Sequence, residues 1–211
     1  MIKNQTPLSA ARKFERETSK QISEKDRPLI HLTPMVGWMN DPNGFCYYQG
    51  EYHLFYQYHP YNTVWGPMHW GHAQSRDLLR WTYLPAALAP DTEADAGGCF
   101  SGTALPLEDG RLMLMYTGVQ PAGMNHKELQ AQCVAIGDGV DFQKLEQNPV
   151  ISGADLPKGY SAHDFRDPKL WRGKDGKFYC AAGNRHEERQ GAVILMESED
   201  GANWHFVTEL D

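Results

Sequence analysis

The chain has 211 residues, a length typical of one domain or a small pair of domains. With 41% hydrophobic and 22% charged residues, its composition is that of a globular protein with a substantial core. The net charge of −7 argues against nucleic acid or an anionic membrane as the main partner, because both reward a basic surface.

Residues 1–30 are predicted to form a helical extension. The segment from about Leu8 to Ser23 lacks glycine and proline and is rich in Ala, Arg, Lys and Glu. This composition favours a surface helix, with Ser9 as its N-cap.

The N-terminus and the cysteines both favour a cytoplasmic location. Residues 1–27 contain no apolar segment of signal-peptide length, and no stretch of the chain approaches the length of a membrane span. The four cysteines form no Cys-x-x-Cys pair, so we expect free thiols in a reducing compartment.

From His31 onward the pattern changes to short strands. Aromatic and apolar runs such as residues 52–56, 112–116 and 177–180 are separated by Gly, Pro, Asn and Asp. Residues 31–211 are therefore predicted to be all-β.

The strands repeat with a period of about 62 residues. Asp77 and Asp138 are 61 residues apart, and Asp138 and Asp200 are 62 apart. Each is followed four positions later by an aromatic residue, namely Trp81, Phe142 and Trp204. A repeat of about four strands is typical of a β-propeller blade. About three blades fit the chain, whereas propellers close with typically 4 to 8, so we expect an incomplete fragment.

Two aspartates stand at equivalent points of this repeat. Asp41 lies in the segment Trp-Met-Asn-Asp-Pro-Asn-Gly (38–44) and Asp167 in Phe-Arg-Asp-Pro-Lys (165–169), 126 residues later. Both segments also suit turns on backbone grounds alone. In a propeller the first strand of each blade lines the central channel, so Asp41, Ser101 and Asp167 are expected to face one axis. Enzymes that cleave a glycosidic bond usually use two carboxylates that act on the same substrate.

The neighbours of these aspartates predict their ionisation. Trp38 and Met39 are expected to desolvate Asp41 and tune its pKa, because apolar groups disfavour a charge. Arg166 is expected to keep Asp167 ionised and to depress its pKa.

Five segments together resemble glycoside hydrolase family 32, the group of invertases, inulinases and sucrose-6-phosphate hydrolases. The matching segments are residues 38–44, 55–57, 65–72, 100–102 and 165–169. The resemblance extends over residues 31–211, and the heptad at 38–44 is highly specific by itself. It implies a five-bladed propeller with a funnel-shaped active site, usually followed by a β-sandwich.

The resemblance also implies residue roles. Asp41 matches the nucleophile that forms a covalent fructosyl-enzyme, and Asp167 matches the carboxylate that stabilises the transition state. Positions expected to bind the substrate are Trp38, Met39, Asn40, Gln57, Trp65, Phe100, Ser101 and Arg166. No cofactor is implied. The histidines at 53, 59, 69 and 72 have no metal-binding spacing and are interpreted as structural.

The family's acid/base, a glutamate followed by cysteine, has no counterpart here. The four cysteines follow Phe45, Gly98, Gln132 and Tyr179. The preferred hypothesis is an incomplete β-fructofuranosidase that cleaves sucrose or sucrose 6-phosphate with retention, the cytoplasmic location favouring the phosphorylated sugar. One alternative is a non-catalytic, truncated sugar-binding propeller. Another is a related family of five-bladed propellers acting on arabinose or xylose polymers.

Overall fold

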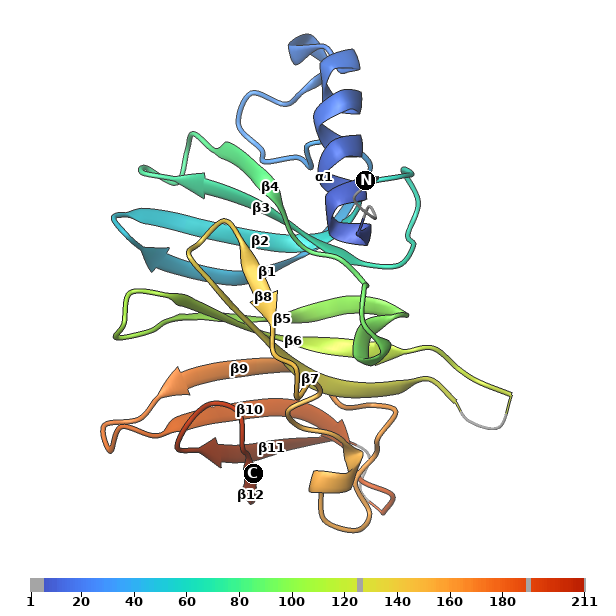
Figure 1. Cartoon of the computed structure of the whole chain (residues 1–211), viewed down its shortest axis with the longest axis vertical. Helices are drawn as coiled ribbons and strands as arrows, with labels where there is room; N and C mark the ends of the chain where they lie inside the picture. Colours follow the sequence, from blue (N-terminus) through green and yellow to red (C-terminus); the bar gives the residue numbers. More distant parts are fainter. Residues whose placement is uncertain (1–5, 125–126, 189–190, 211) are drawn as a thin grey trace, which may run out of the picture.

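The computed structural model describes residues 6–124, 127–188 and 191–210, which form a short helix followed by three four-stranded antiparallel sheets (Figure 1). Helix α1 spans Pro7–Thr18. The first sheet contains β1 (Trp38–Tyr48), β2 (Glu51–His59), β3 (His69–Ser75) and β4 (Thr82–Leu88). The second contains β5 (Gly98–Pro106), β6 (Leu112–Gln120), β7 (Leu129–Gly137) and β8 (Phe142–Lys144). The third contains β9 (Arg166–Arg172), β10 (Phe178–Arg185), β11 (Gly191–Ser198) and β12 (His205–Leu210).

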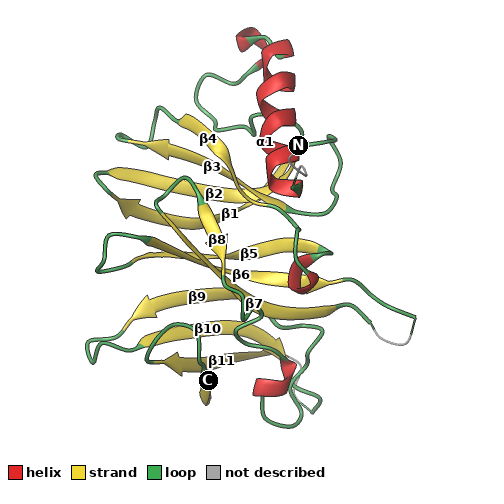
Figure 2. Ribbon diagram, in the orientation of Figure 1, coloured by secondary structure: helices red, strands yellow, loops and turns green. Residues whose placement is uncertain are grey.

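The three sheets follow one another along the long axis of the molecule, with α1 at one end (Figure 2). Within each sheet the strands lie side by side in chain order. The first strands, β1, β5 and β9, contact one another in succession, as the inner strands of propeller blades do. The predicted all-β class, with about three blades behind a short N-terminal helix, is confirmed. Four 3-10 turns complete the described elements, at Ser19–Gln21, Glu24–Asp26, Glu93–Asp95 and Gly153–Asp155.

The sequence period arises from equivalent turns. Asp77, Asp138 and Asp200 each lie between the third and fourth strands of a sheet. Each carboxylate accepts hydrogen bonds from the backbone N–H groups two and three residues later, at 2.7–2.9 Å. These bonds lower the pKa of all three aspartates, because the charged form is the better acceptor.

Glycine closes the first hairpin of every sheet. Gly50, Gly110 and Gly176 have φ angles of 87°, 84° and 88°. Glycine adopts this left-handed region without the Cβ clash that other residues suffer. The repeat predicted from the turn aspartates is therefore confirmed, and these glycines are a further part of it.

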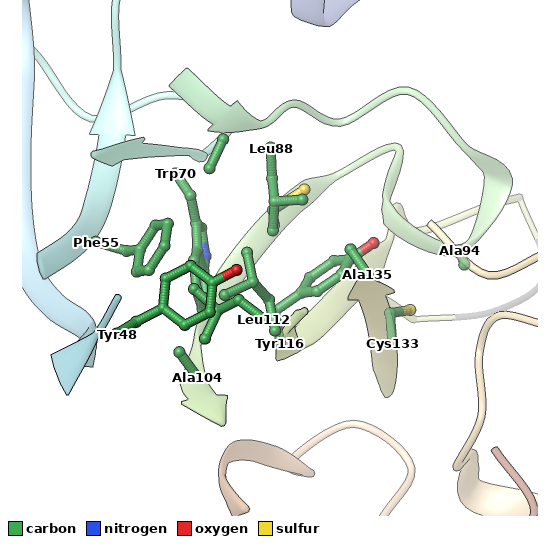
Figure 3. Packing of buried hydrophobic residues seen from close by; sticks show 13 residues of the cluster. Tyr48, Phe55, Trp70, Leu88, Ala94, Ala104, Leu112, Tyr116, Cys133 and Ala135 are labelled. Atoms are coloured by element: carbon green, nitrogen blue, oxygen red, sulfur yellow. The ribbon is translucent and has the colours of Figure 1, made fainter. Parts of the chain in front are cut away.

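Apolar side chains fill the spaces between neighbouring sheets. Between the first and second sheets, Phe55 and Trp70 pack with Leu112, Leu114 and Tyr116 of β6 (Figure 3). A second cluster, which includes Met113, Met115, Phe165, Leu170 and Met196, joins the second and third sheets. Strand β6 thus contributes to both clusters, which explains why its sequence is apolar without alternation. Burying each such large side chain contributes about 1.5–3 kcal/mol.

The N-cap of helix α1 lies three residues before the predicted one. Its N-cap is Thr6, whose hydroxyl accepts a hydrogen bond from the N–H of Ser9 at 3.2 Å. The prediction of Ser9 as N-cap is wrong, because Pro7 occupies the first turn, where a missing N–H costs nothing. The helix also ends at Thr18, five residues before the predicted end.

Two side chains of α1 cover the outer strand of the first sheet. The Glu15 carboxylate accepts a hydrogen bond from the N–H of Ala86 at 2.9 Å, and Arg12 donates to its carbonyl oxygen at 2.9 Å. Arg12 also bonds to Val140 and Asp141 in a turn of the second sheet. The helix therefore satisfies backbone groups at a sheet edge and connects two sheets.

All four cysteines are free thiols, as predicted, and three of them, Cys99, Cys133 and Cys180, are buried. Within the described residues, no helix is long and apolar enough to span a membrane.

Candidate active site

A pocket of about 280 Å³ lies where the three inner strands begin. Its volume is near the lower end of the range for small-molecule sites, about 300–1,000 Å³. Strands β1, β5 and β9 each contribute two lining residues, while β2 and the loop after it contribute one each. The lining residues are Asn40, Asp41, Gln57, Trp65, Phe100, Ser101, Arg166 and Asp167.

On the side of the first sheet, Asp41 is exposed to the pocket. The Ser101 hydroxyl donates to its Oδ2 at 3.3 Å, which joins β5 to β1. Because Asp41 is exposed, Trp38 and Met39 do not bury its side chain, contrary to the expectation. The Trp38 indole N–H donates to Asn40 Oδ1 at 2.8 Å, and Met39 packs against a separate apolar cluster.

The segment that carries Asp41 is an irregular strand, although its sequence also suits a turn. Residues 38–44 lie within β1, and the pairing with β2 shifts register between Met39 and Pro42 and again between Asn43 and Cys46. Gly44 has a φ of 51°, and a Cβ there would lie 2.8 Å from the Phe55 ring. Glycine is required at this position because backbone and core come so close together.

Aromatic and amide groups form another wall of the pocket. Trp65 is exposed and meets the ring of Phe100 edge to face, with centroids 6.2 Å apart. The buried Gln57 amide donates to the carbonyl oxygen of Cys99 at 3.0 Å, which fixes it beside β5. This wall offers apolar ring faces together with hydrogen-bonding groups, as sugar rings require.

On the side of the third sheet, Asp167 adopts an unusual backbone conformation. Its φ is 59°, in the left-handed region that few non-glycine residues occupy. Its N–H donates to the hydroxyl oxygen of Thr117, a residue of the second sheet, at 3.1 Å. The carboxylate that lines the pocket is therefore placed by a neighbouring sheet.

The electrostatics of Asp167 differ from the prediction. Asp167 is exposed to the pocket, but partial desolvation there raises its pKa above that of an ordinary aspartate. Arg166 lowers the pKa by a smaller amount, and the charge of Asp41 raises it further. The expectation that the pKa of Asp167 is depressed overall is wrong. Arg166 lowers this pKa as expected, but desolvation outweighs the guanidinium. The effect of Asp41 indicates that the two carboxylates are close enough to repel each other.

Arg166 is held by a carboxylate that the sequence did not indicate. Asp164 lies 3.6 Å from a guanidinium nitrogen of Arg166 and accepts a hydrogen bond from Arg185 Nε at 2.8 Å. No motif linked Asp164 or Arg185 to the site, because their meeting depends on the pairing of β9 with β10.

Comparison with known proteins shows the family of the chain. Residues 31–211 match the model of the N-terminal domain of glycosyl hydrolases family 32. The chain belongs to this family.

Relatives in the family share both sequence and fold with the chain. A sucrose-6-phosphate hydrolase of Zymomonas mobilis is 43% identical, and the match covers 96% of this chain and 40% of that protein. The GH32 β-fructofuranosidase BmSUC1 of Bombyx mori has a TM-score of 0.84 at 43% identity, covering 99% of this chain and 44% of that one. A mutant of the Bombyx enzyme in complex with sucrose gives the same TM-score at 42% identity, with the same coverage of both chains. The chain thus spans about 40% of the length of the curated relative it matches.

Eight of the ten residues predicted from the resemblance to family 32 line this single pocket. Trp38 and Met39 do not, although Trp38 is connected to the pocket through Asn40. Among the described residues, no group of three or more His, Cys, Asp and Glu side chains is arranged to hold a metal ion. His53 and His72 instead bond to each other at 2.9 Å in the interior.

Proposed function

We propose that the complete protein is a β-fructofuranosidase that hydrolyses sucrose or sucrose 6-phosphate with retention of configuration. One observation carries this proposal: Asp41 and Asp167 line the same pocket, although they lie 126 residues apart in the chain. Residues 31–211 form part of the catalytic propeller domain, and residues 1–30 are an N-terminal extension whose helix, residues 7–18, packs on it.

In the proposed reaction Asp41 attacks the anomeric carbon of the fructosyl unit. The bond to the glucosyl oxygen breaks, that oxygen takes a proton from the acid/base, and a covalent fructosyl-enzyme forms. Water then attacks the same carbon, gives its proton back to the acid/base and releases fructose and free Asp41. Asp167 and Arg166 hold fructose hydroxyls and support the positive charge that develops on the ring.

The described residues supply no third carboxylate to the pocket that could serve as the acid/base. Among the described residues that line the pocket, the carboxylates are Asp41 and Asp167. Retention requires a further carboxyl about 5 Å from the nucleophile. We place this role on a glutamate in a Glu-Cys pair, elsewhere in the complete protein.

The substrate is proposed to be a small sugar in the cytoplasm, with no cofactor. The match to a protein named sucrose-6-phosphate hydrolase supports a phosphorylated disaccharide. The match to a β-fructofuranosidase supports sucrose itself.

The test is hydrolysis by the protein expressed from its complete gene. Sucrose and sucrose 6-phosphate are compared by kcat/KM, and proton NMR of the first fructose released reports its anomeric configuration. Asp41→Ala is expected to lower kcat/KM by roughly 10⁵-fold or more, because the covalent step is lost. Asp109→Ala, in the exposed hairpin between β5 and β6, is the matched control and is expected to retain wild-type activity.

Three results would contradict the proposal. Binding of sucrose without turnover would support a non-catalytic sugar-binding propeller. Cleavage of arabinose or xylose polymers in place of sucrose would support the related propeller family. An inverted first product would rule out the covalent step.

A further inference from the structure

The face of the second sheet that packs on the third changes from apolar to polar along its length. The cross-strand pairs of β6 and β7 on this face are Met113–Ile136, Met115–Val134, Thr117–Gln132 and Val119–Gln130. The first two pairs are apolar, whereas the last two bring in a hydroxyl and two amides. Thr117, Gln130 and Gln132 are all buried, at 0%, 3% and 0% exposure. Burying such groups is unfavourable unless each finds a hydrogen-bond partner.

Their partners lie in the segment that carries Asp167. Gln130 Oε1 accepts a hydrogen bond from the N–H of Phe165 at 3.2 Å. Gln132 Nε2 donates to the carbonyl oxygen of Phe165 at 2.9 Å. The Thr117 hydroxyl accepts from the N–H of Asp167 at 3.1 Å and donates to Gln132 Oε1 at 3.1 Å. Three side chains of one sheet thus fix three backbone groups of the next.

The segment needs such support because Asp167 has a left-handed backbone. With a φ of 59° the residue occupies a region that carries a free-energy cost for any non-glycine residue. Conformations of this kind persist only where the surroundings over-determine them, and they cluster at functional sites. The bond from Asp167 N–H to Thr117 constrains the very peptide group that sets this angle.

We propose that Thr117, Gln130 and Gln132, together the polar bracket, are positioning residues that aim the Asp167 carboxylate at the bound sugar. They act through the backbone of residues 165–167 and do not themselves line the pocket. The inference rests on the proposed function, because it assigns a use to the carboxylate that the bracket places.

Thr117→Val and Thr117→Ser in the complete protein separate positioning from packing. Valine keeps the shape of threonine but removes the hydroxyl, whereas serine keeps the hydroxyl. Thr117→Val is expected to lower kcat roughly 100-fold, the usual penalty for a misplacement of about 1 Å at a reacting centre. Its KM is expected to change by less than about threefold, since the carboxylate acts mainly in the transition state. Thr117→Ser is expected to retain most of kcat.

A second variant tests another member of the bracket. Gln130→Met removes the acceptor of the Phe165 N–H and is expected to lower kcat about tenfold with little change in KM. It keeps the proposal testable if Thr117→Val fails to fold.

A stability control excludes general destabilisation. Ile194→Val removes a methylene from the apolar cluster between the second and third sheets, away from the pocket. It is expected to lower the melting temperature without changing kcat. If Thr117→Val and Gln130→Met behave like Ile194→Val, the polar bracket has no positioning role. If the wild-type protein cleaves neither sugar, the proposed function itself is wrong, and the inference is wrong with it.

Discussion

The two carboxylates of the pocket stand at equivalent places in the first and third sheets but are supported differently. Each precedes a proline on the inner strand of its sheet. Asp41 belongs to an irregular strand that closes around Gly44, and its side chain accepts a hydrogen bond from Ser101. Asp167 has a left-handed backbone, and it is this backbone that the neighbouring sheet holds through Thr117.

This difference shows that the same Asp-Pro dipeptide can be held in place in two ways. The position of Asp41 depends mainly on its own sheet, with one outside contact to the carboxylate. The position of Asp167 depends on buried side chains of another sheet, so substitutions there should reach Asp167 and spare Asp41.

The largest expected effect comes from neutralising the two carboxylates in turn. Asp167→Asn is expected to lower kcat by roughly 10²–10³-fold, since a charge that supports the transition state is lost.

The same substitution should increase the stability of the folded protein. The raised pKa of Asp167 means that the folded protein favours the protonated carboxyl. The associated stability is present below the ordinary aspartate pKa and is lost as the pH rises through the folded pKa. At neutral pH a permanently neutral amide should therefore stabilise the fold slightly, because solvent screens the charge of this exposed residue.

Kinetics and urea denaturation at pH 7 and pH 3 measure both quantities. Asp41→Asn is the matched control and is expected to lose activity without the gain in stability. Equal stabilisation by both variants would show that the two sites do not differ as described.

An intermediate effect is expected for Arg166→Gln. Loss of the guanidinium removes a group proposed to hold fructose hydroxyls, and KM is expected to rise about tenfold. Arg166 also lowers the pKa of Asp167, so its loss should raise that pKa further. The acid limb of the pH profile of kcat/KM should then move to higher pH. A limb that stays in place would mean that Asp167 does not need to be ionised for activity.

The smallest expected effect belongs to Ser101→Ala. Its hydroxyl donates a long hydrogen bond of 3.3 Å to Asp41. A net contribution of about 1 kcal/mol corresponds to roughly a fivefold loss of kcat/KM. If Ser101→Ala lowered activity as much as Thr117→Val does, the hydrogen bond to the Asp41 side chain would matter as much as the one to the Asp167 backbone. The proposed difference between the two sites would then be wrong.

Much of the fold could be predicted because its signals are local. The turn aspartates determine the local backbone conformation, so their period of 61 to 62 residues can be recognised in the sequence. The helix start was missed by a short distance, because Thr6 and Ser9 are both suitable caps and only Pro7 decides between them.

The errors at the candidate site have a non-local cause. The pKa of Asp167 depends on partial desolvation in a pocket that residues of three sheets line, which the adjacent Arg166 does not reveal. Thr117 and Gln132 lie in runs that are otherwise apolar, and their partners come from residues 165–167. A hydroxyl and an amide in such buried runs are the signal that could have indicated them.

The N-terminal helix has a consequence for how this protein meets other chains. Strand β4 is the last strand of its sheet, and an outer strand with free backbone groups invites a foreign strand to pair with it. At Ala86 both groups are already occupied, the N–H by Glu15 and the carbonyl by Arg12. Residues 7–18 thereby hinder the pairing of β4 with a strand of another chain. A helix suits this position because it has no strand edge of its own.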